Sequence, residues 1–185
     1  MAATRYSVTS ILLHWTMALA ILLAWGGMQL AEVLSRGPAK TLVEGGHALL
    51  GLGVLALLLP RILVRLLGHA PGPPAGAPAW EARLAAAMHL LLYALMLALP
   101  LSGLVTALTG RRPFDLAGLG AIPNLLAETG LRGAAKGTHE LLANGLLAVV
   151  ALHVAATLFH AFIRRDDVAA RMIPRLARDD AKPMG

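Results

Sequence analysis

Four long apolar runs dominate the pattern of hydrophobic and polar positions along the chain. They cover approximately residues 8–30, 41–67, 80–108 and 138–163, and polar or Gly/Pro-rich segments separate them. About 20 apolar residues in a helix cross the roughly 30 Å hydrocarbon core of a bilayer, and a helix satisfies its own backbone hydrogen bonds there. The pattern therefore predicts an all-α integral membrane protein, an up-down four-helix transmembrane bundle, as a single domain over residues 1–185.

The first run resembles a signal peptide in its position, but not in its composition. A signal peptide has a shorter apolar core, followed by a cleavage site with small residues. This run carries His14 and Trp15 near its start, and Gln29 and Glu32 follow at its end. We therefore expect a retained helix.

Proline and glycine positions indicate where the helices end or bend. A Pro/Gly-rich loop over residues 69–78 separates the second and third runs, and Pro60 is expected to kink the second helix because it lacks a backbone donor. The connection over residues 109–137 is long, and we expect a short surface helix within it at residues 124–128. Thr138 is the expected N-cap of the fourth helix.

Composition and charge narrow the class of protein further. The 185 residues are 57% hydrophobic and 14% charged, with a mean hydropathy of +0.69, which is too apolar for a soluble domain of this size. The absence of cysteine excludes disulfides, thiolate metal sites and covalent haem attachment. The net charge of +6 comes from basic residues that flank the apolar runs, so it indicates membrane topology and not nucleic-acid binding.

The basic residues also predict the orientation, because cytoplasmic loops carry an excess of lysine and arginine. The side with both termini would hold Arg5, Arg61, Arg65, Arg83, Arg164, Arg165, Arg171, Arg175, Arg178 and Lys182. The opposite side would hold Arg36, Lys40, Arg111, Arg112, Arg132 and Lys136. We therefore expect both termini to be cytoplasmic, with a second, smaller basic rim on the outside.

Histidines inside the apolar runs are the candidate functional residues. His139 and His153 are fourteen residues apart on the fourth run, roughly 40° short of four full helical turns, so they share a face about 21 Å apart in depth. Imidazoles at membrane depth are costly and usually functional. The alternative is a pair of histidines that only pack or hydrogen-bond.

Alternating helix directions arrange four of the histidines in two pairs. His47 falls at the outer level with His139, and His14 falls at the inner level with His153. Each pair offers two imidazoles from different helices at one depth, which is what the iron of a six-coordinate b-type haem requires. The sequence therefore predicts two haem b groups.

The same fourteen-residue spacing assigns a depth to two further residues, Arg61 and Gly103. Arg61, fourteen residues after His47, falls at the inner level and either meets a haem propionate or anchors the helix at the interface. Gly103, fourteen residues after His89, falls at the outer level and either admits a flat macrocycle or serves helix contact. His89 and His160 lie toward the cytoplasmic side as candidates for a quinone or proton role, and His69 is assigned none.

The sequence resembles the bacterial cytochrome b561 family over nearly the whole chain. The matching stretches are Leu13-His14-Trp15, Gly46-His47, Pro60-Arg61-Ile62-Leu63-Val64-Arg65, His89-Leu90-Leu91-Leu92-Tyr93, Ala98-Leu99-Pro100-Leu101-Ser102-Gly103-Leu104, His139-Glu140-Leu141-Leu142-Ala143-Asn144, Leu152-His153 with His160, and Arg171-Met172-Ile173-Pro174-Arg175. The loops at residues 68–78 and 111–136 cannot be matched residue by residue.

The resemblance implies a multi-pass cytochrome of the bacterial inner membrane with two b haems held by His14, His47, His139 and His153. For the most similar members it also implies oxidation of superoxide on the outer side and reduction of ubiquinone in the lipid bilayer. One alternative is a cytochrome b subunit that anchors a partner dehydrogenase or hydrogenase through the loop at residues 109–137. The other is a membrane protein that uses its histidines to transport protons or a divalent metal.

Overall fold

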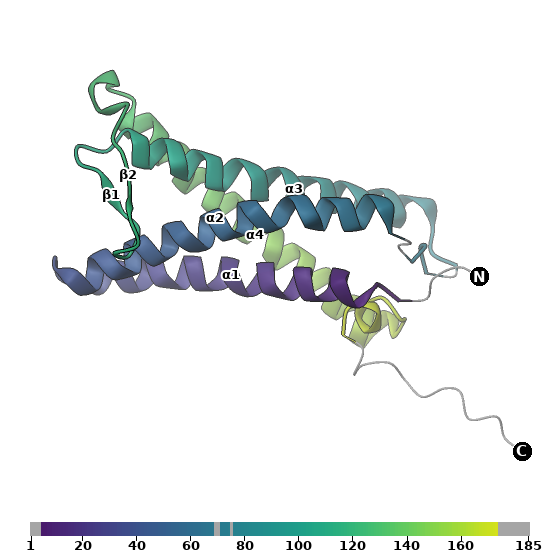
Figure 1. Cartoon of the computed structure of the whole chain (residues 1–185). Coiled ribbons are helices and arrows are strands. Elements are labelled where there is room, and N and C mark those ends of the chain that lie inside the picture. Colours follow the sequence, from purple (N-terminus) through teal and green to yellow (C-terminus); the bar gives the residue numbers. More distant parts are fainter. Residues whose placement is uncertain (1–4, 69–70, 75, 174–185) are drawn as a thin grey trace, which may run out of the picture.

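Four long helices lie lengthwise beside one another in the computed structural model, which describes residues 5–68, 71–74 and 76–173 (Figure 1). They are α1 (Val8–Val33), α2 (Pro38–Leu67), α3 (Ala79–Leu108) and α4 (Arg132–Phe159). Each is long and apolar enough to cross a membrane, α4 together with the turn that continues it to Arg164. The prediction of an all-α, up-down membrane bundle is confirmed.

The helix ends differ from those expected, most clearly in α4. This helix begins at Arg132 with Leu131 before it, so the expected N-cap at Thr138 is wrong. Its first turns hold arginine, alanine and lysine, which favour a helix. The charged residues among them kept this segment out of the apolar run from which the helix was predicted. The short helix expected at residues 124–128 is instead a 3₁₀ turn at Ala127–Thr129.

Helices α1 and α2 extend beyond the expected ranges, and α2 and α3 each continue through a proline. Helix α1 continues to Val33 and α2 begins at Pro38, where proline suits the first helical turn. Pro60 and Pro100 both lie inside continuous helices. His69, Pro174, Arg175, Arg178 and Lys182 lie outside the described residues.

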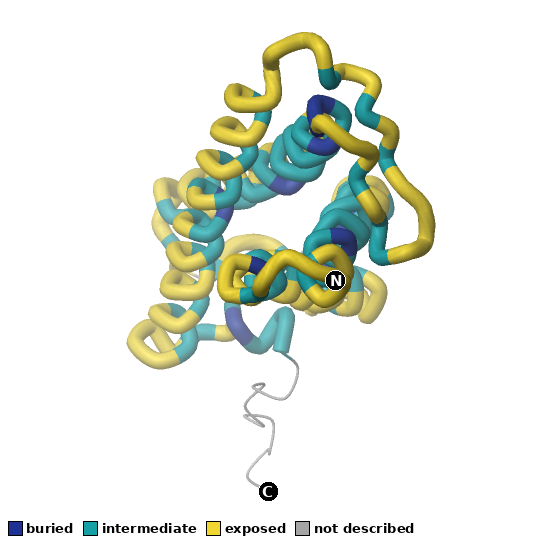
Figure 2. The backbone as a smooth tube through the Cα atoms, turned by 90° about the vertical axis from the view of Figure 1, so that its left-hand side faces the viewer, coloured by how far each residue is buried: buried dark blue, intermediate teal, exposed yellow. Residues whose placement is uncertain are grey.

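The helices pack as two antiparallel pairs, α1 with α2 and α3 with α4, and α2 also packs against α3. The buried core lies between the pairs and consists of Met17, Val54, Leu58, Met96 and Leu146. Figure 2 shows the buried positions on the sides of the helices that face one another. Large apolar side chains are exposed along the outer faces, as expected for surfaces that contact lipid.

A small hairpin covers the end of the bundle opposite the termini. Strand β1 (Phe114–Asp115) pairs antiparallel with β2 (Ala121–Ile122), and Figure 1 shows the hairpin crossing from the α3–α4 pair toward α1 and α2. It lies so close to α2 that a Cβ atom added at Gly45 would clash with the backbone nitrogen of Ala117. Glycine is therefore required at position 45 for this contact.

The chain folds back after α4 at the other end of the bundle. A π-helical turn at His160–Arg164 follows α4 directly, and a 3₁₀ turn at Ala169–Arg171 comes next. The indole Nε1 of Trp15 donates a hydrogen bond to the carbonyl oxygen of Met172 at 3.1 Å. This contact holds the returning segment against α1.

Candidate functional site

The outer histidine pair joins α2 and α4, at the end of the bundle that carries the hairpin. The ring centroids of His47 and His139 are 6.0 Å apart, with the ring planes nearly perpendicular. The Nδ1 atom of His47 lies 2.9 Å from the carbonyl oxygen of Ala24, and Nδ1 of His139 lies 3.1 Å from that of Leu99. A carbonyl oxygen only accepts, so each Nδ1 carries the proton and each Nε2 offers a free electron pair.

The same arrangement is typical of metal-binding histidines, which donate their second ring N–H to a carbonyl or carboxylate. Two metal–imidazole bonds of about 2 Å, with about 1 Å from each nitrogen to its ring centre, separate two ring centroids by about 6 Å. The centroid separation of the outer pair matches this value. By this distance the outer pair is a candidate for binding one metal ion between its two rings.

Glycines shape the space around the outer pair. A Cβ atom added at Gly103 would be 3.0 Å from Cε1 of His139, so any larger residue would push the ring aside. Ser102, next in the chain, places its hydroxyl 3.0 Å from Nδ1 of His139. Cβ atoms added at Gly51 or Gly53 would meet nothing within 4 Å, so α2 leaves open space beside His47.

The inner level holds three histidines, one more than a haem iron needs. The ring centroids of His14 and His153 are 6.3 Å apart, and those of His89 and His153 are 5.5 Å apart. The first distance also matches two imidazoles on one metal. His89, expected only to lie toward this side, thus joins the inner group from α3.

Arg61 brings a positive charge to the inner level from α2. Its Nη2 donates a hydrogen bond to Nδ1 of His14 at 3.0 Å, and its guanidinium carbon lies 5.9 Å from the ring centre of Tyr93. Its Nη1 is buried and has no hydrogen-bond partner among the residues that the structure describes. Because a buried donor without a partner is costly, this site suits an anionic acceptor, and a haem propionate is one.

The two levels are separated by apolar side chains. Leu146 lies midway between His139 and His153 on α4, seven residues from each, and belongs to the buried core. Within the residues described, no three His, Cys, Asp or Glu side chains are grouped so that they could hold a bare metal ion. The outer level offers two imidazoles and the inner level three, fewer side-chain donors than a bare ion usually takes, and a macrocycle would bring four nitrogens of its own.

A comparison with known families identifies the family of the chain. The family described as prokaryotic cytochrome b561 matches residues 5–175. The chain belongs to this family. Membership makes it a multi-pass bacterial membrane protein that transfers electrons and binds haem b.

Individual relatives match the chain over almost its full length. Cytochrome b561 homolog 1 of Escherichia coli K12 is 30% identical, over 92% of this chain and 98% of its own length. Cytochrome b561 homolog 2 of the same organism is 31% identical, over 95% and 94%. A Yersinia pestis protein named probable superoxide oxidase CybB is 28% identical, over 92% and 97%. The chain is therefore similar to whole cytochromes b561 and not to a fragment of one.

Three polar residues near these histidines were missed by the sequence analysis. Ser102 contacts His139, Tyr93 lies beside Arg61, and Asp166 lies 2.6 Å from Nδ1 of His160. Tyr93 and Ser102 are one turn from His89 and one residue from Gly103, so helical spacing could have suggested both. Asp166 carried no comparable signal, because its contact depends on the reversal of the chain after α4.

Proposed function

We propose that this cytochrome b561 carries two b haems and transfers electrons from superoxide, on the periplasmic side, to ubiquinone in the membrane. The observation that carries the proposal is the presence of two histidine pairs, at two levels of the bundle, with ring separations of 6.0 and 6.3 Å. The outer haem would be held by His47 and His139, and the inner haem by His14 and His153. Both termini would face the cytoplasm, as the distribution of basic residues favours.

Haem b would supply reversible one-electron chemistry, and the chain's own residues would supply ligation, orientation and charge. The backbone carbonyls of Ala24 and Leu99 orient the outer imidazoles so that Nε2 is free. Arg61 offers a buried, unpaired donor for an anionic group at the inner level. The apolar core around Leu146 keeps water out of the space between the levels.

Superoxide as the donor is supported by charge and by one relative. Four basic residues near the outer end are exposed, and they would attract an anion and raise its rate of encounter. They are Arg111, Arg112, Arg132 and Lys136, joined in the sequence-based rim by Arg36 and Lys40. The Yersinia pestis relative is named for the same activity. The proposed reaction consumes two superoxide anions, one ubiquinone and two protons, and yields two molecules of dioxygen and one ubiquinol.

His89 and His160 are the proposed quinone or proton residues of the inner side. His89 lies beside the inner pair, 5.5 Å from the ring of His153. His160 begins the π turn that follows α4, at the end of the bundle that would face the cytoplasm. Both positions suit the reduction of a quinone that enters from the bilayer near the inner haem.

The direct test is a coupled assay on purified, haem-loaded protein. A superoxide source and a short-chain ubiquinone are supplied together, and superoxide loss and ubiquinol formation are both measured. The proposal expects two superoxide anions consumed per ubiquinol, at a rate that falls with ionic strength because the encounter is electrostatically steered. Haem that is reduced by dithionite but not by superoxide would contradict the proposed donor.

A second candidate is a cytochrome b subunit that relays electrons between a partner dehydrogenase or hydrogenase and quinone. The observation in its favour is that the outer connection exposes large apolar side chains away from the lipid-facing helices. These are Leu119, Leu125 and Leu131, with 81%, 76% and 53% of their surface exposed. Gentle extraction from the native membrane would then yield a stable complex with a redox subunit, and the isolated chain would be inert toward superoxide.

A further inference from the structure

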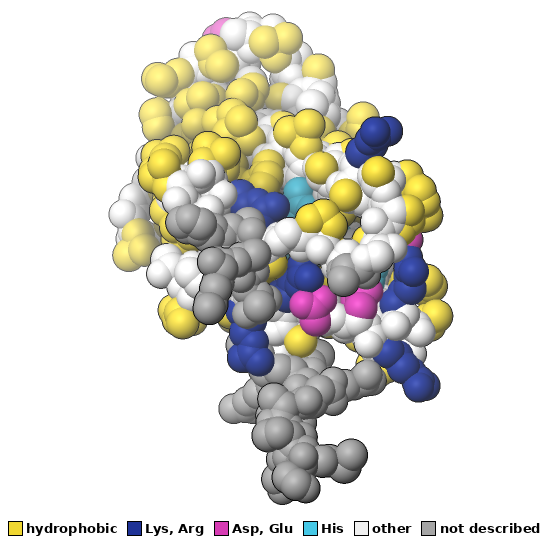
Figure 3. Space-filling model, turned by 90° about the vertical axis from the view of Figure 1, so that its right-hand side faces the viewer, with side chains coloured by type: hydrophobic (Ala, Val, Ile, Leu, Met, Phe, Trp, Pro, Cys, Tyr) yellow, Lys and Arg dark blue, Asp and Glu magenta, His cyan; other side chains and the backbone are white. Residues whose placement is uncertain are grey.

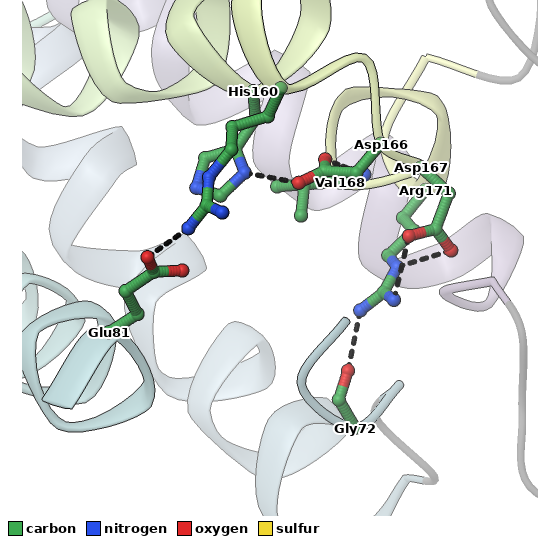
Figure 4. Close-up of polar contacts among 8 residues, drawn as sticks. Gly72, Glu81, His160, Asp166, Asp167, Val168 and Arg171 are labelled. Atoms are coloured by element: carbon green, nitrogen blue, oxygen red, sulfur yellow. Dashed lines mark hydrogen bonds and ion pairs between the residues drawn. The ribbon is translucent and has the colours of Figure 1, made fainter. Parts of the chain in front are cut away.

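The end of α4 forms a histidine–aspartate pair outside both haem levels. The helix widens into the π turn that begins at His160, and Arg165 then takes a left-handed conformation with φ 55°. This reversal brings Asp166 back beneath His160, whose carbonyl oxygen accepts from the Asp166 backbone N–H at 3.2 Å. The side chains meet with Nδ1 of His160 2.6 Å from Oδ2 of Asp166, as Figure 4 shows.

His160 continues the stripe of α4 that carries the candidate haem ligands. It follows His153 by seven residues, which is roughly 20° short of two full turns and about 10 Å further along the axis. His139, Leu146 and His153 precede it at the same spacing on the same face. His160 therefore lies between the inner level and the aqueous side, with 23% of its side chain exposed.

Asp166 differs from the other carboxylates at this end in lacking an arginine partner. Glu81 of α3 pairs with Arg164, and Asp167 pairs with Arg171. Among the described residues, Asp166 accepts only from His160 and, through Oδ1, from the backbone N–H of Val168 at 3.1 Å. Within the described part of the chain, the one side chain that contacts the Asp166 carboxylate is therefore an imidazole, a group that can carry a proton on either ring nitrogen.

Several contacts hold this pair in place. Arg171 donates to the carbonyl oxygen of Gly72 at 2.6 Å, in the loop between α2 and α3. Trp15 of α1 holds Met172, and Ala169 is buried. Figure 3 views this end of the molecule, where basic and acidic side chains lie among exposed apolar ones. The turn after α4 is thus tied to α1, to α3 and to the α2–α3 loop.

We propose that Asp166 and His160 form the proton-uptake pair for quinone reduction on the inner side. This inference rests on the proposed function. Asp166, 24% exposed, takes a proton from cytoplasmic water and passes it to Nδ1 of His160. The Nε2–H bond of His160 breaks as its proton moves to an oxygen of the reduced quinone. Two electrons from two superoxide anions and two protons taken up in this way convert one quinone to one quinol. His160 is the proton donor, and Asp166 positions its ring and returns a proton to it.

The test compares a proton-dependent oxidant with a proton-independent one. Haem-loaded protein is reduced anaerobically and mixed in a stopped-flow instrument with either a short-chain ubiquinone or ferricyanide, which accepts electrons without protons. Asp166→Asn keeps an oxygen for the Val168 N–H but cannot carry a proton. Asp167→Asn is the matched control, because it removes the adjacent carboxylate. His160→Gln is the second variant, which leaves Asp166 in place as the acceptor for Val168.

In Asp166→Asn we expect haem oxidation by ubiquinone to slow roughly ten- to 100-fold, as for the loss of a general acid–base group. Its solvent deuterium isotope effect should rise, oxidation by ferricyanide should be unchanged, and Asp166→Glu should recover part of the rate. Asp167→Asn should behave as wild type, and His160→Gln should behave as Asp166→Asn.

Three results would overturn the inference. If Asp166→Asn and His160→Gln react with ubiquinone at the wild-type rate and isotope effect, the pair is not the route, although the proposed function stands. If haem oxidation by ubiquinone and by ferricyanide slows equally in these variants, the pair only supports the fold. If ubiquinone does not oxidise the wild-type haem while ferricyanide does, the proposed function fails, and this inference fails with it.

Discussion

The outer and inner levels of the bundle both join two imidazoles across helices, but they fix them in different ways. At the outer level, backbone carbonyls hold the Nδ1 atoms of His47 and His139. At the inner level, the guanidinium of Arg61 donates to Nδ1 of His14, and a third imidazole, that of His89, lies beside His153. The outer pair is thus set by neutral groups, two backbone carbonyls and the Ser102 hydroxyl, while the inner group contains a fixed charge and a third imidazole.

This difference has a chemical consequence. A guanidinium is always protonated and can only donate, so its bond to His14 needs Nδ1 as an acceptor. A metal on Nε2 is favoured instead when Nδ1 carries the proton and donates. We therefore expect Arg61 to leave His14 for a haem propionate when the inner haem is bound, whereas the outer residues need no such exchange.

Removing single imidazoles should have the largest effect on haem content, and it tests whether the outer and inner pairs are assigned correctly. His47→Ala and His139→Ala should each lose the outer haem, and His14→Ala the inner one, because each haem then lacks an axial nitrogen. The measurement is the haem content per chain, with the Soret absorbance falling by about half in each variant. His89→Ala is the decisive comparison, since His89 is nearer to His153 than His14 is. If it removes a haem while His14→Ala retains both, the inner pair is His89 with His153.

Enlarging Gly103 should affect only the outer level. A leucine at this position would occupy the place of the His139 ring, because even a Cβ atom would be 3.0 Å from it. We expect Gly103→Leu to lose the outer haem and retain the inner one, and Gly103→Ala to release the outer haem faster than wild type. Gly26→Ala is the control, since its Cβ would meet nothing within 4 Å. Equal haem loss at both levels would mean that Gly103 serves the whole fold and not the outer site.

Removing the charge of Arg61 should alter the inner haem and spare the outer one. A positive charge near the haem favours its reduced form, because it attracts the added electron. Arg61→Gln should therefore lower one of two midpoint potentials by tens of millivolts in a spectroscopic redox titration. Arg65→Gln, which removes the exposed arginine that contacts Tyr6, should lower the inner potential less than Arg61→Gln does and leave the outer potential unchanged. A shift of the outer potential alone would contradict the placement of Arg61.

The smallest effect is expected from Ser102→Ala. Its hydroxyl is one of two acceptors near Nδ1 of His139, and the carbonyl of Leu99 remains in the variant. Loss of a supporting group typically weakens metal binding by ten- to 100-fold, so we expect no more than about tenfold faster release of the outer haem. The rate of haem transfer to an acceptor protein measures this, and faster release of the inner haem would contradict the assignment of Ser102 to the outer level.

Helical periodicity made the membrane fold and the pairing of histidine levels predictable from the sequence. A fourteen-residue spacing keeps a face and fixes a depth, so His139 and His153 could be placed before their partners were seen. The start of α4 could not be predicted in this way, because its first turns lie outside the apolar run. The contact of Arg61 with His14 and the return of Asp166 to His160 depend on side-chain packing and on a π turn, which leave no periodic signal.

The most direct test of the central claim is the haem content of the purified wild-type chain, measured with its dithionite-reduced spectrum. Two bis-histidine sites predict two b haems per chain, both low-spin. One haem per chain would mean that only one of the pairs His47–His139 and His14–His153 binds iron. A folded, membrane-extracted protein without haem would contradict the account and leave the histidines to proton or metal transport.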